Sequence, residues 1–323
     1  MLETRHVVSY NPRMRVVKSP AELQPGPKKV CLAIGFFDGV HLGHQQIIRQ
    51  TVADAELHEA MAVVVTFDQH PNTVVAPDRV PPLIYSLPQK LRAIASTGAD
   101  TTLLLHFDEA FSRQSGEQFV HWLVREFGHL TSICVGSTFT FGHKRSGNVE
   151  LLKRMGAEFK FAVHGLAAVA LDGDIVSSTR IREMIRNGHF DLASQMLGRG
   201  YTLCGTVMKG DGLGRKIAVP TANLDVTSLV LPPTGVYAVH AHHAGKTYRA
   251  VLNLGYRPTI QNPTPELRVE AHLLEFKGDL YGEELELTFA ERLRNEQKFP
   301  SVDALKTQIA ADIEHAKRVF DNG

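Results

Sequence analysis

Residues 34–46 read IGFFDGVHLGHQQ, and this stretch joins a short apolar run to an apolar-periodic segment. The run before it, residues 30–34, is VCLAI, which is typical of a buried strand. In the segment after it, residues 47–52, apolar side chains recur at a spacing that favours a helix. The stretch is therefore predicted to be a strand-to-helix turn.

That position suits a phosphate group. The first backbone N–H groups of a helix have no partner within it, and the helix dipole presents partial positive charge there, so an anion is stabilised. Room is supplied by Gly35, Gly39 and Gly43. His41 and His44 add two imidazoles, which can donate to developing negative charge. Two histidines near a turn are ordinarily surface residues, but their spacing on this turn favours a functional site.

Short apolar runs alternate with helical patterns from residue 30 to about residue 188, which predicts parallel βαβ units. The expected strands are residues 30–34, 62–67, 102–107, 132–136 and 159–163. The expected helices are residues 45–60, 88–97, 115–127 and 148–155. Ligands of an open parallel sheet bind beyond the carboxyl ends of its strands, so residues 35–44, 66–71 and 136–147 should converge there.

The pattern changes after Leu197, because the runs become rich in β-formers and are separated by Gly or Pro turns. These runs, residues 201–208, 235–242, 246–254, 267–276 and 284–292, predict an antiparallel barrel. A closing helix should begin near Ser301, a plausible N-cap, and pack Leu305, Ile309, Ile313 and Val319 on the barrel. Residues 187–200 would form the joint. A length of 323 residues also favours two domains, which we place at 1–187 and 188–323.

Composition excludes several classes of protein. A hydrophobic share of 43% with 21% charged residues is that of an ordinary soluble protein, and a net charge of +1 argues against a broad surface for nucleic acid or membrane. The charged opening residues lack a secretory apolar core, so we expect a cytoplasmic protein. Cys31, Cys134 and Cys204 are isolated, fit neither a disulfide framework nor a zinc pattern, and are expected to fill space.

Three further motifs fall in the first half: TFDQHP at residues 66–71, VGSTFTFG at 135–142 followed by Arg145, and SSTRIR at 177–182. In the last motif Ser178 and Thr179 can cap a helix and donate to an anion. Arg182, on the same face, offers a charged fork for phosphate. Ser-Ser-Thr alone would be an ordinary N-cap, but beside the histidine motif it favours a triphosphate site.

In the second half, residues 205–224 read GTVMKGDGLGRKIAVPTANL, a glycine-rich cationic loop that can fold over phosphates. Two familiar phosphate-binding patterns are excluded, because Arg215 and His240 stand where each requires glycine. Thr221 and Asn223 share a strand face and offer oxygen ligands that suit Mg²⁺. A strand end capped by polar residues is the alternative.

Glu270 and His272 also share a strand face. Facing the barrel interior they would be costly without a task, whereas facing outward they would be merely solvated. The histidines His240, His242 and His243 do not favour a metal site, because no carboxylate or cysteine at suitable spacing completes it.

In their order along the chain, the motifs resemble those of the bacterial bifunctional riboflavin kinase/FAD synthetase family. GFFDGVHLGH is similar to the HxGH signature of nucleotidyltransferases, and PTAN at residues 220–223 and NLGYRPT at 253–259 are similar to riboflavin kinase motifs. The resemblance runs from about Met14 to Asp312. It implies an α/β Rossmann-like nucleotidyltransferase domain followed by an all-β riboflavin-kinase barrel with a C-terminal helix.

The resemblance also implies two reactions and their residues: ATP phosphorylates riboflavin to FMN, and FMN is then adenylylated to FAD with release of pyrophosphate. His41, His44 and Arg182 would position and stabilise the adenylyl transfer, and Glu270 would be the general base on the ribityl 5′-hydroxyl. Substrate- and nucleotide-binding roles are implied for Gly35, Phe37, Asp38, Gly39, His70, Phe139, Arg145, Ser178, Thr179, Gly210, Gly212, Gly214, Arg215, Asn253 and Arg257. Thr221 and Asn223 would hold Mg²⁺.

The sequence departs from the family pattern at Phe36, Gln69, Thr138, Gly200 and Ala218. Three of these lie on the binding edge of the first domain, so one alternative is a riboflavin kinase with a weak or altered adenylyltransferase. A second alternative is a flavin-binding regulator without turnover, against which Thr221, Asn223 and Glu270 count. The expected partners are riboflavin, FMN and ATP, without nucleic acid or membrane.

Overall fold

The computed structural model describes residues 14–23, 29–210, 219–257 and 266–322. The chain divides into two compact units. The first comprises residues 1–180 with 196–198, and the second comprises residues 181–195 with 199–323. The predicted boundary between residues 187 and 188 stays a prediction. Within the described residues, no helix combines the length and apolar character needed to cross a membrane.

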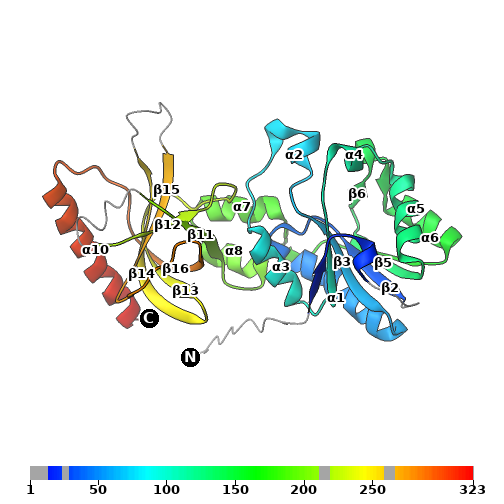
Figure 1. Ribbon diagram of the computed structural model, residues 1–323, viewed down its shortest axis with the longest axis horizontal. Helices are drawn as coiled ribbons and strands as arrows, with labels where there is room; N and C mark the ends of the chain where they lie inside the picture. The colour runs from blue at the N-terminus through cyan, green and yellow to red at the C-terminus, as the bar shows by residue number, and fades with distance from the viewer. Residues whose placement is uncertain (1–13, 24–28, 211–218, 258–265, 323) are drawn as a thin grey trace. The chain divides into compact units, whose positions relative to one another are not determined.

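The first unit is built on a six-stranded parallel sheet in the order β1-β4-β3-β2-β5-β8 (Figure 1). Its strands are β1 Arg15–Val17, β2 Val30–Ile34, β3 Met61–Phe67, β4 Thr101–Leu105, β5 Leu130–Gly136 and β8 Ala162–Leu166. The strand order reverses at β2, which pairs with β3 on one side and β5 on the other. Ligands of open α/β sheets bind at such a reversal, so the turn after β2 stands at the expected place.

Helices cover both faces of this sheet. They are α1 Leu42–His58, α2 Asn72–Val75, α3 Leu87–Ala95, α4 Glu109–Ser112, α5 Gly116–Phe127 and α6 Val149–Phe159. Alternate residues of β2 separate the two faces, because Leu32 packs in the core with Leu123 and Leu152 of α5 and α6, whereas Cys31 packs with Ala55 of α1. The four predicted helices are confirmed within a few residues as α1, α3, α5 and α6.

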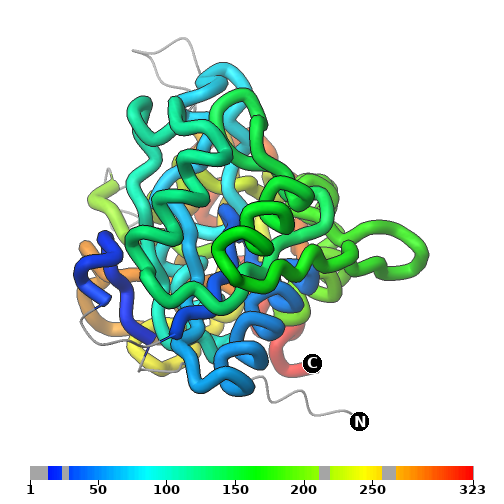
Figure 2. The backbone as a smooth tube through the Cα atoms, turned by 90° about the vertical axis from the view of Figure 1, so that its right-hand side faces the viewer, coloured from blue at the N-terminus to red at the C-terminus, as the bar shows by residue number. Residues whose placement is uncertain are grey.

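The predicted strand 159–163 begins too early. Phe159 is the last residue of α6, Lys160 ends that helix with a left-handed backbone (φ 62°), and β8 starts at Ala162. An apolar run cannot by itself show where a buried helix end gives way to a strand. Strand β1 was not predicted. The antiparallel pair β9 Ala170–Leu171 and β10 Asp174–Ile175 forms a hairpin that projects from the first unit in Figure 2.

The second unit contains a closed barrel in the order β11-β12-β15-β14-β13-β16. Its strands are β11 Thr202–Met208, β12 Ala222–Asp225, β13 Gly235–His243, β14 Lys246–Arg257, β15 Glu266–Leu273 and β16 Glu284–Arg294. All their pairings are antiparallel, which confirms the predicted barrel. The expected joint, residues 187–200, proves to contain a helix, α8 Phe190–Leu197, that follows α7 Ser178–Arg186.

The predicted closing helix is α10 Val302–Asn322, which lies along the outside of the barrel (Figure 1). Ser301 caps it, because its hydroxyl oxygen accepts from the N–H of Ala304 at 3.2 Å. Of the four predicted residues, Ile313 and Val319 pack against Val236 and neighbouring barrel residues together with Ala316, whereas Leu305 and Ile309 stay half-buried outside this cluster. All three cysteines are buried thiols that form no disulfide, as expected of space-filling residues. Burial raises the pKa of Cys134 to about 12.

Candidate functional sites

The turn between β2 and α1 has an unusual backbone. Phe37 and Val40 have left-handed φ angles of 55° and 42°, and Gly39 between them has a φ of 74°. Gly39 also lies against the Ile84 side chain, which would stand 3.0 Å from an added Cβ. The turn thereby reverses the chain in a few residues and delivers His41 to the N-cap position of α1.

His41 and His44 lie together at the start of α1. Their rings are stacked with centroids 3.6 Å apart. The rings of Phe37 and His44 form a T-shaped pair with centroids 5.2 Å apart. Nδ1 of His41 accepts from the N–H of His44 at 3.4 Å, so the proton of a neutral His41 ring stands on Nε2. A Cβ at Gly43 would stand 3.3 Å from the His41 ring, so glycine makes room for the stack.

Asp38 is buried and serves the backbone around it. Its carboxylate accepts from the N–H groups of Ile84 at 2.9 Å and Tyr85 at 3.4 Å. Its carbonyl oxygen accepts from the hydroxyl of Ser178 at 3.1 Å, which brings the Ser-Ser-Thr motif to the histidine turn. The sequence assigned the cap of α7 to Ser178 and Thr179. This was wrong, because Ser177 accepts from the N–H of Arg180 and Ser178 is already helical.

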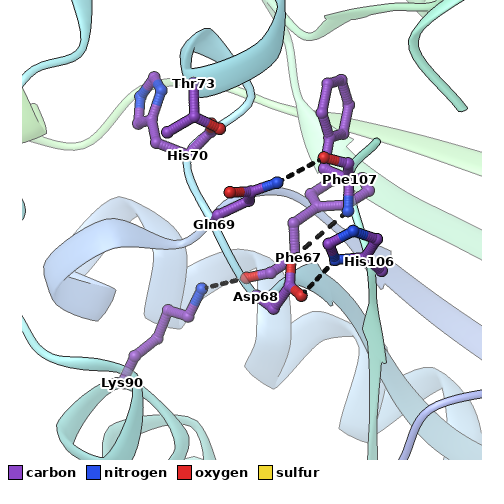
Figure 3. A network of polar contacts seen from close by, with 8 residues as sticks. All are labelled: Phe67, Asp68, Gln69, His70, Thr73, Lys90, His106 and Phe107. Atoms are coloured by element: carbon purple, nitrogen blue, oxygen red, sulfur yellow. Dashed lines mark hydrogen bonds and ion pairs between the residues drawn. The ribbon is translucent and has the colours of Figure 1, made fainter. Parts of the chain in front are cut away.

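The end of β3 carries a second group of polar residues (Figure 3). Gln69 donates to the carbonyl oxygen of Phe107 at 2.7 Å, which gives this departure from the family pattern a structural task. Asp68 pairs with the exposed His106 at 2.7 Å, and the hydrogen bond that its carboxylate accepts from the His106 ring raises the pKa of His106. His70 accepts from the N–H of Asn72 at 3.0 Å and lies edge-on to Phe36, with ring centroids 4.8 Å apart.

Lys90 of α3 is a buried residue beside the turn between β2 and α1 that the sequence did not single out. The residue is 3% exposed, and its Nζ donates to the carbonyl oxygen of Phe67 at 2.7 Å (Figure 3) and to that of Phe36 at 3.3 Å. Burial lowers the pKa of Lys90 to about 8, although Asp38 and Asp68 act in the opposite direction. A signal was present, since Lys90 precedes the fully buried Ile94 by one helical turn and so occupies an apolar position.

Other expected binding residues of the first half are more dispersed. Phe139 follows β5 and stacks on Phe141, while Arg145 and Thr179 are exposed. The departure Thr138 is exposed as well. Arg182 is buried on α7 but belongs to the second unit, so its part beside the histidines stays a prediction.

In the barrel, polar residues of three neighbouring strands are paired as cross-strand neighbours. Glu270 of β15 lies opposite Asn223 of β12 on one side and Asn253 of β14 on the other. The residues flanking Glu270, Val269 and Ala271, are 2% and 0% exposed. Side chains alternate along a strand, so Glu270 faces the outside of the barrel. The structure decides between the two orientations that the sequence left open.

Glu270 is nevertheless not fully solvated, because it and His272 are both half-buried. Nδ1 of His272 lies 2.7 Å from the carbonyl oxygen of Pro220, so it donates there and holds the PTAN segment against β15. Sequence reasoning gave His272 no task. On this half-buried outward face, the carboxylate of Glu270 lies between the strands that carry Asn223 and Asn253, and the main chain of Pro220 binds His272 beside it.

Gly210 shows how closely this surface is assembled. A Cβ at Gly210 would stand 2.3 Å from Nδ2 of Asn223, so any larger residue would displace that amide. Thr221 and Asn223 lie on the same face of the chain, both half-buried, with neutral oxygen atoms that suit a hard cation. Gly212, Gly214 and Arg215 lie outside the described residues, as does Ala218. Arg257 is described only as the last residue of β14.

The three histidines of β13, His240, His242 and His243, contact hydroxyl groups, a carbonyl oxygen and an aromatic ring. The two ring nitrogens of His242 lie 2.9 Å from the hydroxyl of Thr247 and 3.0 Å from that of Thr288. His243 lies 3.3 Å from the carbonyl oxygen of Glu284, and His240 packs against Phe320. These contacts tie β13 to its neighbours.

Comparisons with known proteins match both halves of the chain. A family model described as FAD synthetase matches residues 23–180, and a model described as riboflavin kinase matches residues 197–320. A bifunctional riboflavin kinase/FMN adenylyltransferase of Haemophilus influenzae is 38% identical over 90% of this chain and 94% of its own. The Escherichia coli K12 protein of the same description is 34% identical over 95% of this chain and 98% of its own.

Among solved structures, a Streptococcus pneumoniae protein described as a macrolide-efflux protein has a similar fold. Its TM-score is 0.77 at 29% identity, and the likeness covers 94% of this chain and 99% of that one. The efflux description concerns that protein alone.

Proposed function

This chain belongs to the family of bifunctional riboflavin kinases/FMN adenylyltransferases, and from that premise we propose how its residues divide the two reactions. It is an enzyme of flavin cofactor biosynthesis that phosphorylates riboflavin to FMN with ATP, then adenylylates FMN to FAD with release of pyrophosphate. The regulator without turnover that the sequence left open is set aside. The proposal concerns which side chains act, with domains at 1–187 and 188–323.

In the kinase half, Glu270 is proposed as the general base that accepts the proton of the ribityl 5′-hydroxyl as that oxygen attacks the γ-phosphorus of ATP. A positioned carboxylate is sufficient for this task. The observation that supports it is the alignment of Asn223, Glu270 and Asn253 on three adjacent strands. Asn253 is proposed to orient the substrate, and Gly212, Gly214, Arg215 and Arg257 are proposed to bind the ATP phosphates.

Mg²⁺ is proposed at Thr221 and Asn223. The fit rests on the Asn223 amide, which lies against Gly210 and would be displaced by a larger residue there, and on the shared face of the two side chains. Neutral oxygen ligands suit this ion when ATP phosphates complete its shell. When bound, it would neutralise charge on the transferring phosphates.

In the adenylyltransferase half, alignment and charge neutralisation are the tasks, because attack of FMN on the α-phosphorus of ATP needs no covalent help from protein. The stacked His41 and His44 at the N terminus of α1 support a phosphate site there. Arg182 is proposed to neutralise charge with them. Gly35, Phe37, Gly39, His70, Phe139, Arg145, Ser178 and Thr179 are proposed to line the site. Asp38 is proposed to act mainly through the backbone that it holds.

The second candidate function is a riboflavin kinase with a weak or altered adenylyltransferase. It is favoured by three departures from the family pattern, at Phe36, Gln69 and Thr138. A cytoplasmic location is also proposed, since three buried cysteines that form no disulfide suit a reducing compartment.

The experiment is to incubate purified protein with riboflavin, ATP and Mg²⁺ and to separate the flavins by chromatography. Glu270→Gln should lower FMN formation by about 10²- to 10⁴-fold while FAD still forms from supplied FMN. Its control is Glu291→Gln, an exposed glutamate of β16. His44→Asn should lower FAD formation from FMN while FMN still forms from riboflavin. Its control position is His58, an exposed histidine of the same helix. Equal loss of both activities in either variant would refute the division.

A further inference from the structure

The turn that presents His41 is held in a costly conformation. Phe37 and Val40 have left-handed backbones, a conformation that is unfavourable for residues other than glycine unless their surroundings favour it. Phe37 and Val40 are both buried, so the surroundings that hold their backbone conformation are protein groups and not water. Specific contacts must therefore hold this turn.

The carbonyl oxygen of Phe36, directly before the turn, accepts two hydrogen bonds. One comes from the hydroxyl of Thr66 at 2.9 Å and the other from Nζ of Lys90 at 3.3 Å. The same ammonium donates to the carbonyl oxygen of Phe67 at 2.7 Å. It also stands 4.3 Å from the centroid of the Phe36 ring. One buried cation therefore joins the chain leaving β2 to the chain leaving β3.

The residues just before Lys90 hold the other side of the turn. The N–H groups of Ile84 and Tyr85 bind the Asp38 carboxylate, and the Ile84 side chain packs on Gly39. Residues 84–90 thus hold the carbonyl before the turn and the carboxylate within it. We call this arrangement the turn clamp.

Burying a cation in this clamp costs stability. Desolvation lowers the pKa of Lys90 to about 8, and the charged groups that face it are Asp38 and Asp68. Lys90 lies at a position of α3 where Leu or Met would pack without that cost. A charge kept at a cost to folding indicates a task beyond packing.

We propose that Lys90 is a positioning residue for adenylyl transfer, holding the Phe37–Val40 turn so that His41, His44 and the N terminus of α1 meet the phosphates of ATP. The inference rests on the proposed role of the two histidines. Lys90 itself contacts main chain and acts through the turn. A small displacement of aligned groups is enough to slow such a reaction by about a hundredfold.

The test compares Lys90→Met with Lys153→Met, a matched control at an exposed lysine of α6 in the same unit. Both variants are assayed for FAD formation from FMN and ATP, for FMN formation from riboflavin, and for thermal unfolding. Hydrogen exchange of residues 35–44 reports the turn directly.

For Lys90→Met we expect kcat for FAD formation to fall by about ten- to a hundredfold with KM for FMN changed less than about threefold. Exchange in residues 35–44 should accelerate, while FMN formation holds and the melting temperature does not fall. Lys153→Met should change none of these.

Unchanged kcat for Lys90→Met would overturn the proposal, as would an activity loss that merely follows a lower melting temperature. Failure of the proposed site is distinguishable, because it would appear as normal FAD formation by His44→Asn. In that case faster exchange in residues 35–44 of Lys90→Met would still support the clamp but not its catalytic purpose, which would overturn the proposal.

Discussion

Two ion pairs join α10 to the barrel, and their different burial predicts very different contributions to stability. Asp312 accepts from Nε and Nη2 of Arg294 at 2.9 Å and 2.8 Å, with side-chain exposures of 6% and 20%. Asp321 pairs with Arg249 at the same 2.8 Å, but those side chains are 64% and 48% exposed. Both pairs join an aspartate of α10 to an arginine of the barrel at the same distance, and they differ in burial and in the number of hydrogen bonds that the carboxylate accepts.

Asp312→Ala removes the partner of a largely buried guanidinium, and Gln308 loses its 2.8 Å hydrogen bond to the same carboxylate. Breaking a buried pair in this way costs about 3–5 kcal/mol. We expect about 3 kcal/mol, since Arg294 retains some access to water. Asp321→Ala should cost less than about 1 kcal/mol, because solvent screens an exposed pair.

The assay is thermal unfolding, followed by circular dichroism and by the riboflavin kinase activity that survives heating. For a unit of this size, 1 kcal/mol shifts the melting temperature by about 3 °C, so Asp312→Ala should lower it by about 9 °C. Replacing both partners, as Arg294→Met with Asp312→Leu, should recover much of the loss. If Asp312→Ala and Asp321→Ala melt within about 2 °C of each other, the argument from burial is wrong.

Three further predictions follow from contacts elsewhere in the chain. Gly210→Ala should lower kcat for FMN formation by about tenfold or more, measured beside unchanged FAD formation, because its Cβ would displace the Asn223 amide. Asp54→Ala should cost about 2 kcal/mol of unfolding free energy in urea titrations, since the buried carboxylate accepts from Ser132 at 2.8 Å and Gln50 at 2.8 Å; the exposed Glu56 of the same helix is the control. Finally, the folded chain binds the Lys90 proton less tightly than the unfolded chain, because the pKa falls from 10.5 to about 8. The free energy of unfolding should thus rise between about pH 8 and 10.5 by about 3 kcal/mol relative to Lys90→Met, and parallel pH profiles of the two proteins would count against this assignment.

The turn clamp shows what a linear motif leaves out. The histidine motif was readable because a strand, a glycine turn and a helix start are neighbours in sequence, and helix N termini bind anions for local reasons. Lys90 lies far along the chain from Phe36, and its contact exists only because β3 pairs beside β2 and α3 packs behind the turn. No local periodicity reports such a contact.

Glu270 gives the same lesson in the barrel. Sequence placed Glu270 and His272 on one face of a strand, because side chains alternate with a period of two. Which face meets the core depends on how six strands close, and the burial of Val269 and Ala271 settles it. The cap of α7 and the end of α6 were also misplaced, since neighbouring Ser and Thr residues cap equally well and an apolar run fits either element.

By itself, then, the sequence determined the two fold classes, most of their elements, and the family to which the motifs belong. These properties are carried by short-range hydrophobic periodicity and by residues within one turn of each other. Tertiary structure decided the strand order around β2, the outward face of Glu270, and the buried contacts of Lys90, Asp38 and His272. Those depend on strand pairing and packing between distant segments, which no stretch of the chain encodes alone.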